Sequence, residues 1–188
     1  MGTKKINYTI TFLSDWHAGS GLSSGADADS VVIKDKNNLP YLPGKTIKGL
    51  LKDVFEDFKE VQPTLVNNDF IKTYFGNFNK KQNESHQGQL FFSNAELNKK
   101  EKSEISKEMS NLLYRNIAST KIGKNGVAEN GSLRTMQVCV PVVLEAYIDG
   151  VLEEDIAKFD KAMKCIRHIG ANRNRGLGRC KFEINKII

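Results

Sequence analysis

Apolar and polar residues alternate near the start of the chain and again in its second half. Residues 6–13 have the sequence Ile-Asn-Tyr-Thr-Ile-Thr-Phe-Leu, and residues 136–148 follow a similar alternation. A period of two is typical of a strand that buries one face. Further strand candidates are residues 31–33, 88–95 and 180–187.

Two other segments carry apolar residues at the spacing of one helix face. The later one runs from Leu152 to Ile169 and stops at Gly170, a residue type that commonly ends helices. In the earlier one, Gly44 or Thr46 is the candidate N-cap. Its apolar positions are Ile47, Leu50, Leu51, Val54, Phe55 and Phe58.

The stretches between these elements are polar. Residues 77–87 indicate an insertion or exposed loop, and residues 99–113 have few apolar anchors, so any helix there is expected at the periphery. Glycines in residues 121–134 favour a protruding hairpin. The order strand, helix, strands, helix, strand predicts an α+β, ferredoxin-like fold with helices on one face of an antiparallel sheet. At 188 residues, a single domain spanning 1–188 is expected.

The charge is modest in total but uneven along the chain. Lys and Arg number 28 against 22 Asp and Glu, a net charge of +6. Residues 170–179 combine three glycines with three arginines, a composition suited to holding a polyanion. Clustered arginine beside such a loop is what nucleic-acid binding requires. The arginines of the C-terminal third are Arg134, Arg167, Arg173, Arg175 and Arg179.

Several classes of protein are disfavoured. Cys139, Cys165 and Cys180 lack Cys-x-x-Cys spacing, which supports neither a disulfide framework nor a zinc site and fits a reducing cytoplasm. No apolar run approaches the ~18 residues of a membrane span, so no membrane association is expected. The Gly44-Lys-Thr sequence lacks the glycine that a phosphate-binding loop needs five positions earlier, where Leu39 stands.

Acidic and histidine side chains are concentrated near the first strand. Asp15 and His17 flank Trp16 beside a glycine-rich and serine-rich loop, and Asp27, Asp29 and Asp35 follow. These residues are candidates for a metal or general-base site. A single histidine is more often structural than catalytic, and loop aspartates commonly cap turns.

Five blocks of sequence occur in a characteristic order. They are residues 16–21; residues 29–35 leading to the Pro43-Gly44-Lys45 block; Phe75-Gly76 leading to residues 88–95; residues 126–134; and the loop 170–179. Together they resemble the RAMP superfamily of CRISPR-associated proteins, and more narrowly the backbone subunit of type III (Csm and Cmr) effector complexes. The blocks span nearly the whole chain.

This resemblance implies a modified RNA-recognition fold whose copies stack along a guide RNA, with a thumb hairpin from each copy wedged between bases. Lys45 and Lys48 would grip the guide backbone, and Arg134 would close the thumb at about residues 119–134. Arg173, Arg175 and Arg179 would contact RNA from the glycine-rich loop. The implied partners are guide RNA, target RNA and other effector subunits, including copies of this chain.

The resemblance also implies a cleavage site. The family's RNA-cleaving aspartate precedes another acidic residue by six positions, as Asp29 precedes Asp35. Asp29 would hold a divalent metal, Mg²⁺, that neutralises a scissile phosphate while a neighbouring 2′-hydroxyl attacks. Asp27 is close enough in sequence to take this role instead.

Two alternatives remain open on sequence grounds. Related capping subunits share the Pro43-Gly44-Lys45 block without cutting RNA, so the chain is alternatively a non-catalytic scaffold that binds RNA and neighbouring subunits. A third reading is a stand-alone guide-processing endoribonuclease in which His17 acts, although such enzymes usually lack that block.

Overall fold

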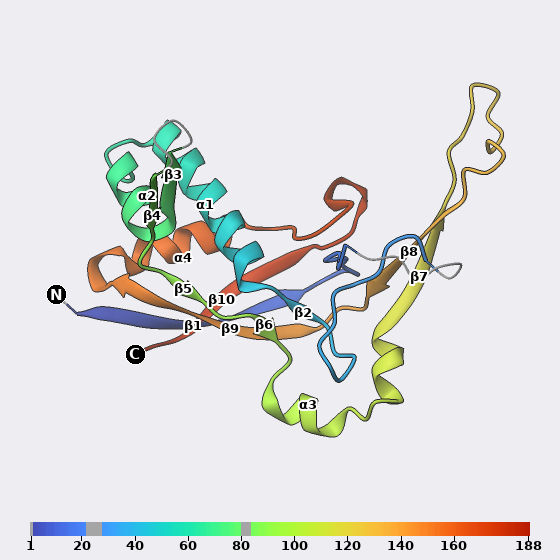
Figure 1. The fold of residues 1–188 in the computed structure, drawn as a ribbon, viewed down its shortest axis with the longest axis horizontal. Coiled ribbons are helices and arrows are strands. Elements are labelled where there is room, and N and C mark those ends of the chain that lie inside the picture. Colours follow the sequence, from blue (N-terminus) through green and yellow to red (C-terminus); the bar gives the residue numbers. More distant parts are fainter. Residues whose placement is uncertain (1, 22–27, 80–83) are drawn as a thin grey trace.

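The computed structural model describes residues 2–21, 28–79 and 84–188. Its centre is a six-stranded sheet with strand order β10-β1-β9-β6-β2. The sixth strand, β5, also pairs with β9. Figure 1 shows the sheet running through the middle of the molecule. The strands are β1 (Thr3–Phe12), β2 (Tyr41–Leu42), β5 (Phe91–Phe92), β6 (Ala95–Glu96), β9 (Val143–Leu152) and β10 (Cys180–Ile187).

The order of elements along the chain gives the fold class. Helix α1 (Gly44–Val61) connects β1 to β5 and β6, and α4 (Ile156–Cys165) connects β9 to β10. The long strand β9 lies antiparallel between β1 and the β5/β6 pair, while β10 lies antiparallel on the other side of β1. Both helices lie on one side of the sheet in Figure 1. The predicted α+β, ferredoxin-like fold is therefore confirmed.

The hydrophobic core lies between the sheet and these two helices. The alternation in β1 buries Ile6, Tyr8, Ile10 and Phe12, as its period of two predicts. The helices add side chains from one face each, and the rings of Phe55 and Phe159 have centroids 4.9 Å apart. The buried helix residues are Ile47, Leu51, Phe55, Phe159, Ala162 and Met163.

Several smaller elements surround this core. Helix α2 (Asn68–Phe75) was not predicted; the Asn67 side chain caps it by accepting a hydrogen bond from the Phe70 N–H at 2.8 Å. The polar insertion expected over 77–87 contains most of a hairpin of β3 (Gly76–Asn79) and β4 (Glu84–Gln87). Helix α3 (Lys99–Glu104), followed by the 3₁₀ turn η1 (Met109–Leu113), buries no residue and is peripheral as expected.

A separate two-stranded hairpin projects from the body of the molecule (Figure 1). It consists of β7 (Tyr114–Ser119) and β8 (Arg134–Cys139), and we call residues 114–139 the thumb. The single strand predicted over 136–148 is wrong, because β8 and β9 belong to different sheets. Pro141 lies between them, and proline has no N–H with which to continue a ladder.

Other predicted boundaries also need correction. The helix predicted to reach Ile169 ends at Cys165, because the chain then pairs with the later loop through the bridge between His168 and Arg179. The N-cap of α1 is Pro43, since the helix already begins at Gly44. The strand predicted at 31–33 is only an isolated bridge between Gly19 and Val32. The strand predicted at 88–95 is divided into β5 and the start of β6.

Two short 3₁₀ turns complete the described structure, η2 (Glu153–Asp155) before α4 and η3 (Arg173–Arg175) in the glycine-rich loop. None of the helices in the described part of the chain is both long and apolar enough to cross a membrane.

Candidate functional site

A short segment after β1, buried at residues 15–17, supports the elements around the candidate site. We call residues 13–17 the anchor segment. Trp16 exchanges two backbone hydrogen bonds with Cys139 at the end of the thumb, at 3.0 and 2.8 Å. The Asp15 carboxylate, 7% exposed, is ion-paired with Arg115 on β7. The anchor segment therefore fixes the base of the thumb to the sheet.

The same segment holds the glycine-rich loop, residues 170–179. The carbonyl groups of Asp15 and His17 accept hydrogen bonds from the N–H groups of Gly178 and Ala171, at 2.7 and 2.9 Å. A Cβ atom at Gly170 would lie 2.2 Å from the His17 carbonyl oxygen. That glycine is thus required by close packing of the chain against itself, whereas the sequence suggested close approach to a ligand.

His17 links these two regions to the loop that carries Asp29. Its Nδ1–H donates to the Gln137 carbonyl oxygen at 2.6 Å, so its Nε2 accepts from the Ser30 hydroxyl at 2.9 Å. The ring is 3% exposed. With both nitrogens occupied and no access to solvent, His17 is a structural residue, and this geometry disfavours a catalytic role for it.

Asp29 is attached to β8 by its backbone and its side chain. Its N–H donates to the Thr135 carbonyl oxygen, and its Oδ2 accepts from the Thr135 N–H, both at 2.8 Å. The residue is nevertheless exposed, and within the described part of the chain nothing donates a hydrogen bond to Oδ1. The Asp29 carboxylate is held in place with one oxygen available to a ligand.

This carboxylate lines a groove between the thumb and the glycine-rich loop. A cavity of ≈ 380 Å³ holds Asp29 together with Arg134 from β8 and Arg175 from the loop. A second cavity of ≈ 350 Å³ shares Ser119 and both arginines with the first and continues toward the thumb tip. We call the two cavities together the thumb–loop groove. Its other lining residues are Ser30, Ile117, Thr120, Lys121, Ile122, Ser132, Thr135, Met136, Asn172 and Leu177.

Cations outnumber carboxylates along this groove. Arg134 and Arg175 are exposed, and in the described residues neither has a salt-bridge partner. Lys121 is neutralised by Glu129 at 2.8 Å. Two guanidinium groups and one carboxylate in the lining give a net attraction for phosphate, while Ile117, Met136 and Leu177 add apolar surface suited to a base or ribose.

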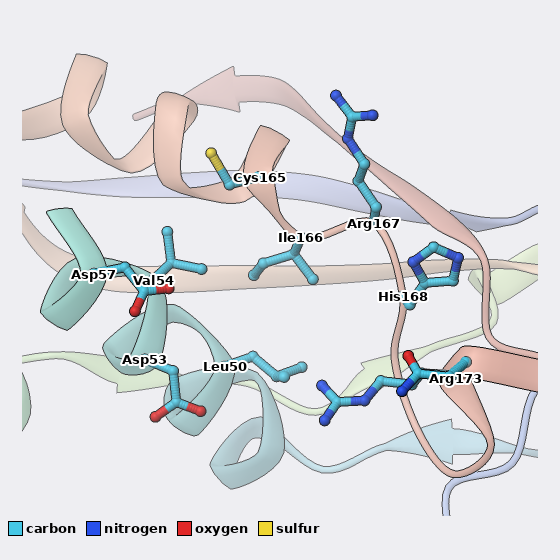
Figure 2. Close-up of a pocket in the computed structure, with 10 residues that line it drawn as sticks. Leu50, Asp53, Val54, Asp57, Cys165, Ile166, Arg167, His168 and Arg173 are labelled. Carbon is cyan, nitrogen blue, oxygen red and sulfur yellow. The ribbon is translucent and has the colours of Figure 1, made fainter. Parts of the chain in front are cut away.

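The other loop arginines face different cavities. Arg173 shares a cavity of ≈ 380 Å³ with Leu50 and Asp53 of α1, and Figure 2 shows its side chain extending toward them. Arg179 lines a further cavity with Arg167 and Lys181. The structure therefore brings Asp29, Arg134 and Arg175 together and places Arg173 and Arg179 elsewhere on the loop.

The two lysines predicted to bind RNA lie at the start of α1. Lys45 is exposed and Lys48 is half-buried, and neither lines the thumb–loop groove. The first N–H group of the helix, at Gly44, donates to the Asn94 side chain at 3.0 Å and so is already used within the protein. A phosphate contact at this end of α1 would depend on the lysine side chains.

Comparison with known proteins identifies the family. A family model of the RAMP superfamily matches residues 9–181. The chain belongs to the RAMP superfamily. A search of curated proteins found no significant match.

Among solved structures, this RAMP protein is similar to chains of type III-B Cmr-β complexes determined by cryo-electron microscopy. One comes from a complex bound to cognate target RNA, with a TM-score of 0.71, 13% sequence identity and 96% of each chain covered. Another comes from the apo state, with a TM-score of 0.69, 12% identity and 97% of each chain covered. At these identities the likeness establishes the shared fold.

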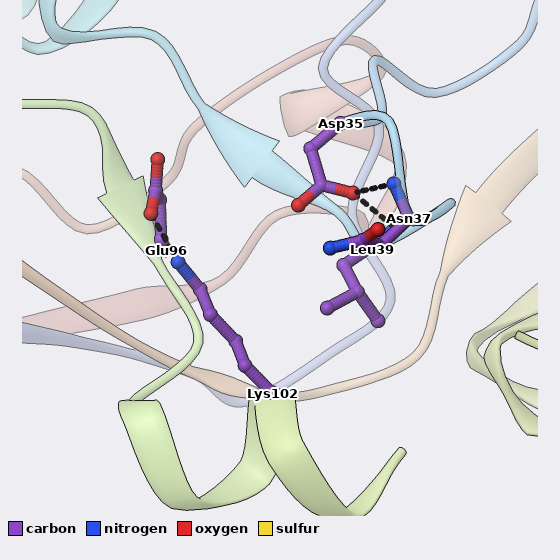
Figure 3. A network of polar contacts seen from close by, with 5 residues as sticks. All are labelled: Asp35, Asn37, Leu39, Glu96 and Lys102. Atoms are coloured by element: carbon purple, nitrogen blue, oxygen red, sulfur yellow. Dashed lines mark hydrogen bonds and ion pairs between the residues drawn. The ribbon is translucent and has the colours of Figure 1, made fainter. Parts of the chain in front are cut away.

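The carboxylate that follows Asp29 by six positions has a local role in this RAMP chain. Asp35 Oδ1 accepts hydrogen bonds from the N–H groups of Asn37 and Leu39, at 2.8 and 2.9 Å (Figure 3). These bonds close the turn at Asn38, which has a positive φ of 62°. Asp35 is absent from the lining of the groove, and Asp27 lies outside the described residues.

Sequence reasoning missed the residues that position Asp29 and line the groove. Thr135 acts through its backbone, and Ser30 acts through a histidine 13 positions away. Asn172 enters the groove because its left-handed backbone, with φ 55°, turns the loop. An asparagine between Gly170 and Gly176 is a known signal for such a conformation, and it was the one local clue available.

Proposed function

We propose that this RAMP protein is an RNA-binding subunit of a type III CRISPR effector complex and that it contacts guide RNA through the thumb–loop groove. The observation that carries the proposal is the meeting of Arg134 and Arg175 with Asp29 across one groove. These residues come from distant parts of the sequence, yet the anchor segment supports both walls. The similar chain from the RNA-bound Cmr-β complex supports the same function.

The proposal extends to the partners. Target RNA paired with the guide, and other effector subunits that include copies of this chain, would complete the assembly. A projecting thumb whose tip exposes Ile122, Val127 and Leu133 fits a role between nucleic acid and neighbouring subunits, because exposed apolar groups gain stability when a partner covers them.

We also propose that Asp29 cleaves the paired target RNA. Thr135 fixes the carboxylate, and the hydrogen bond from Ser30 to His17 fixes the backbone beside it. Arg134 and Arg175 would bind the phosphates on either side and stabilise the charge that develops on the scissile phosphate. The thumb would hold the strand in the splayed form that an in-line attack by a 2′-hydroxyl needs.

The side chains near Asp29 limit how a metal ion could bind there. In the described residues no group of three or more His, Cys, Asp or Glu side chains is placed to hold one. Mg²⁺ is commonly bound by one or two carboxylates plus substrate phosphates, so Asp29 fits an ion that arrives with the RNA. Such an ion would neutralise charge on the scissile phosphate.

A non-catalytic scaffold is the second candidate function. Its supporting observation is that Asp29 already has a structural task, since its two hydrogen bonds with Thr135 tie the loop to the thumb. On this alternative the carboxylate holds the groove in shape and the two arginines bind RNA without a cut.

The RNA-binding proposal is tested with a labelled single-stranded RNA and the double variant Arg134→Ala/Arg175→Ala. Log affinity falls with log salt concentration, and each phosphate contact makes this slope steeper by about 0.7. The double variant should therefore reduce the steepness by about 1.4 and weaken binding at low salt. The matched control is Lys164→Ala, whose ammonium is ion-paired with Asp160 at 2.6 Å on α4. An unchanged slope in the double variant would contradict the groove assignment.

The cleavage proposal is tested separately in the assembled complex with guide RNA and Mg²⁺. Asp29→Asn keeps an oxygen that can accept from the Thr135 N–H but removes the charge. We expect target RNA to bind with unchanged affinity and to remain uncut. Cleavage at the wild-type rate would overturn the assignment of Asp29, whereas an uncut target in the wild-type complex would support the scaffold.

A further inference from the structure

The side of the sheet opposite α1 and α4 carries a separate groove. It has a volume of ≈ 610 Å³ and lies between the uncovered faces of β1, β5, β9 and β10 and the start of α3. Figure 1 shows α3 below the sheet, on the side away from α1 and α4. We call this the open-face groove. Its polar lining includes the amides of Asn7, Asn94, Asn98 and Asn185.

Two aromatic rings lie side by side in this groove. Phe91 on β5 and Tyr147 on β9 have ring centroids 5.8 Å apart. Phe91 is 57% exposed, whereas Tyr8 and Phe182 in the same sheet are buried. The Lys5 ammonium lies 3.6 Å from the centroid of the Tyr147 ring. An exposed ring with a cation beside it is well suited to a flat, electron-rich ligand.

The charges of the groove nearly balance. Glu96 and Glu145 lie directly opposite each other on neighbouring strands, and Lys102 forms an ion pair with Glu96. Lys99 and Lys186 add positive charge to the lining, and Lys5 lies above it. Glu145 and Asp149, the cross-strand neighbour of Phe91, offset two of these three charges. A ligand here would be held mainly by its rings and hydrogen bonds, with about one phosphate neutralised.

We infer that the open-face groove binds a short segment of single-stranded RNA, with its bases stacked on the Phe91 and Tyr147 rings. Folds of the RNA-recognition type hold bases on aromatic side chains of the open sheet face, and β9 is a central strand of that face here. The asparagine amides supply donors and acceptors for base edges. This site lies apart from the thumb–loop groove, and it does not depend on the function proposed for that groove.

RNA fits this groove better than a protein surface does. Phe91 is the one large apolar side chain among the lining residues that is exposed, whereas a stable protein interface needs a larger apolar centre. Stacking requires only ring faces and tolerates any base. Association between copies of the chain through Phe91 is the competing outcome.

The experiment measures binding of labelled oligouridylate to the full chain carrying Arg134→Ala/Arg175→Ala, which weakens the first groove. Adding Phe91→Leu/Tyr147→Leu removes both rings but keeps apolar side chains. We expect affinity to fall about tenfold or more, since both rings on which bases stack are lost. Tyr147→Phe alone keeps the ring and leaves Phe91 in place. In the same Arg134→Ala/Arg175→Ala chain, this variant should bind as tightly as the chain with Tyr147. Ultraviolet crosslinking followed by mass spectrometry should attach uridine to Phe91 or Tyr147.

Salt dependence separates the two grooves. The open-face component should have a slope of no more than about 0.7, as expected for one phosphate, while the thumb–loop component should be steeper. Crosslinks confined to the thumb and loop, with affinity unchanged by the leucine variants, would overturn the inference. Concentration-dependent dimers abolished by Phe91→Leu, without crosslinks at either ring, would overturn it in favour of a contact between copies. The single variant Phe91→Leu, at an exposed position, provides a folded comparison if the double variant fails to fold.

Discussion

The thumb and the glycine-rich loop form opposite walls of the same groove, yet they are attached to the body in different ways. The loop is tied to the body at both of its ends: Ala171 and Gly178 donate to the anchor segment, and Ile169 donates to the Gly178 carbonyl oxygen at 2.9 Å. The thumb is attached at its base, through Trp16, Asp29 and Ser30, and its outer half is exposed.

The glycines of the two walls differ in how closely the chain packs around them. A Cβ atom at Gly178 would lie 1.9 Å from the Ile169 carbonyl oxygen, so no other residue type fits at this position unless the backbone moves. Gly131 in the thumb also has a positive φ, 72°, but a Cβ there would meet nothing within 4 Å. We infer that the loop is a fixed wall, and that the thumb is a wall whose outer part takes its final shape against a partner.

The largest effect should come from Gly178→Ala. The added methyl group collides with backbone and the φ of +71° strains alanine, so the free energy of unfolding should fall by about 3 kcal/mol or more. Gly131→Ala is the matched control and should cost about 1 kcal/mol, because only the left-handed conformation is strained. Urea unfolding of both variants measures the difference. Equal losses would break the distinction between the two walls.

The His17 ring bonds the thumb and the loop that carries Asp29, so its removal should affect that side of the groove, while its carbonyl oxygen still accepts from Ala171. His17→Ala leaves the Gln137 carbonyl and the Ser30 hydroxyl without partners and opens a cavity, which should lower the free energy of unfolding by about 2 to 3 kcal/mol. His86→Ala, at an exposed histidine, should change it by less than about 0.5 kcal/mol. A stable His17→Ala variant would mean that the buried histidine is retained for chemistry instead of structure.

Arg115→Ala should loosen the thumb and spare the loop. It leaves the buried Asp15 carboxylate without its ion pair, at a cost of about 1 to 2 kcal/mol, discounted because the arginine is largely exposed. Hydrogen exchange should quicken at the Cys139 N–H, at the base of the thumb, more than at the Gly178 N–H in the loop. Lys164→Ala, which breaks an exposed pair, should cost about 0.5 kcal/mol or less. Equal acceleration at both amides would show that the two walls open together.

The sequence predicted the elements that bury a regular face. The alternation of β1 and the helical spacing of α1 both correspond to buried side chains. The later helix was predicted too long because Ile166 and Ile169 fit a helical period, although both are buried after the helix ends. Their burial depends on pairing with the loop, a contact that no local pattern contains.

The site was predictable as residue types and not as an arrangement. The resemblance singled out Asp29, Arg134 and Arg175 individually, but Asp29 meets Thr135 across 106 positions of sequence. Nothing local indicates that Arg173 and Arg179 face other cavities, since the three arginines share one short loop. The turn around Asn172 and Gly176 directs each side chain, and that turn depends on packing against His17.

The smallest expected effect is a difference in the rates at which cysteines in the two walls are labelled by a thiol reagent. Cys139 lies where the thumb leaves the body and Cys180 where the loop rejoins the sheet, and both are buried, whereas Cys165 is exposed. Burial raises the pKa of the Cys139 and Cys180 thiols to about 12, so at pH 8 both remain protonated and react slowly. A thiol-specific reagent should therefore label one cysteine of the native chain quickly, and Cys165→Ser should abolish that phase.

In the Cys165→Ser background, the two slow phases compare the walls directly. Labelling of Cys139 requires the base of the thumb to open, and labelling of Cys180 requires the loop to detach from the anchor segment. Because both ends of the short loop are tied to the anchor segment, Cys139 should react first, and Arg115→Ala should speed that reaction alone. Faster labelling of Cys180 would reverse the assignment of the fixed wall, even if the stability of every variant followed the order given above.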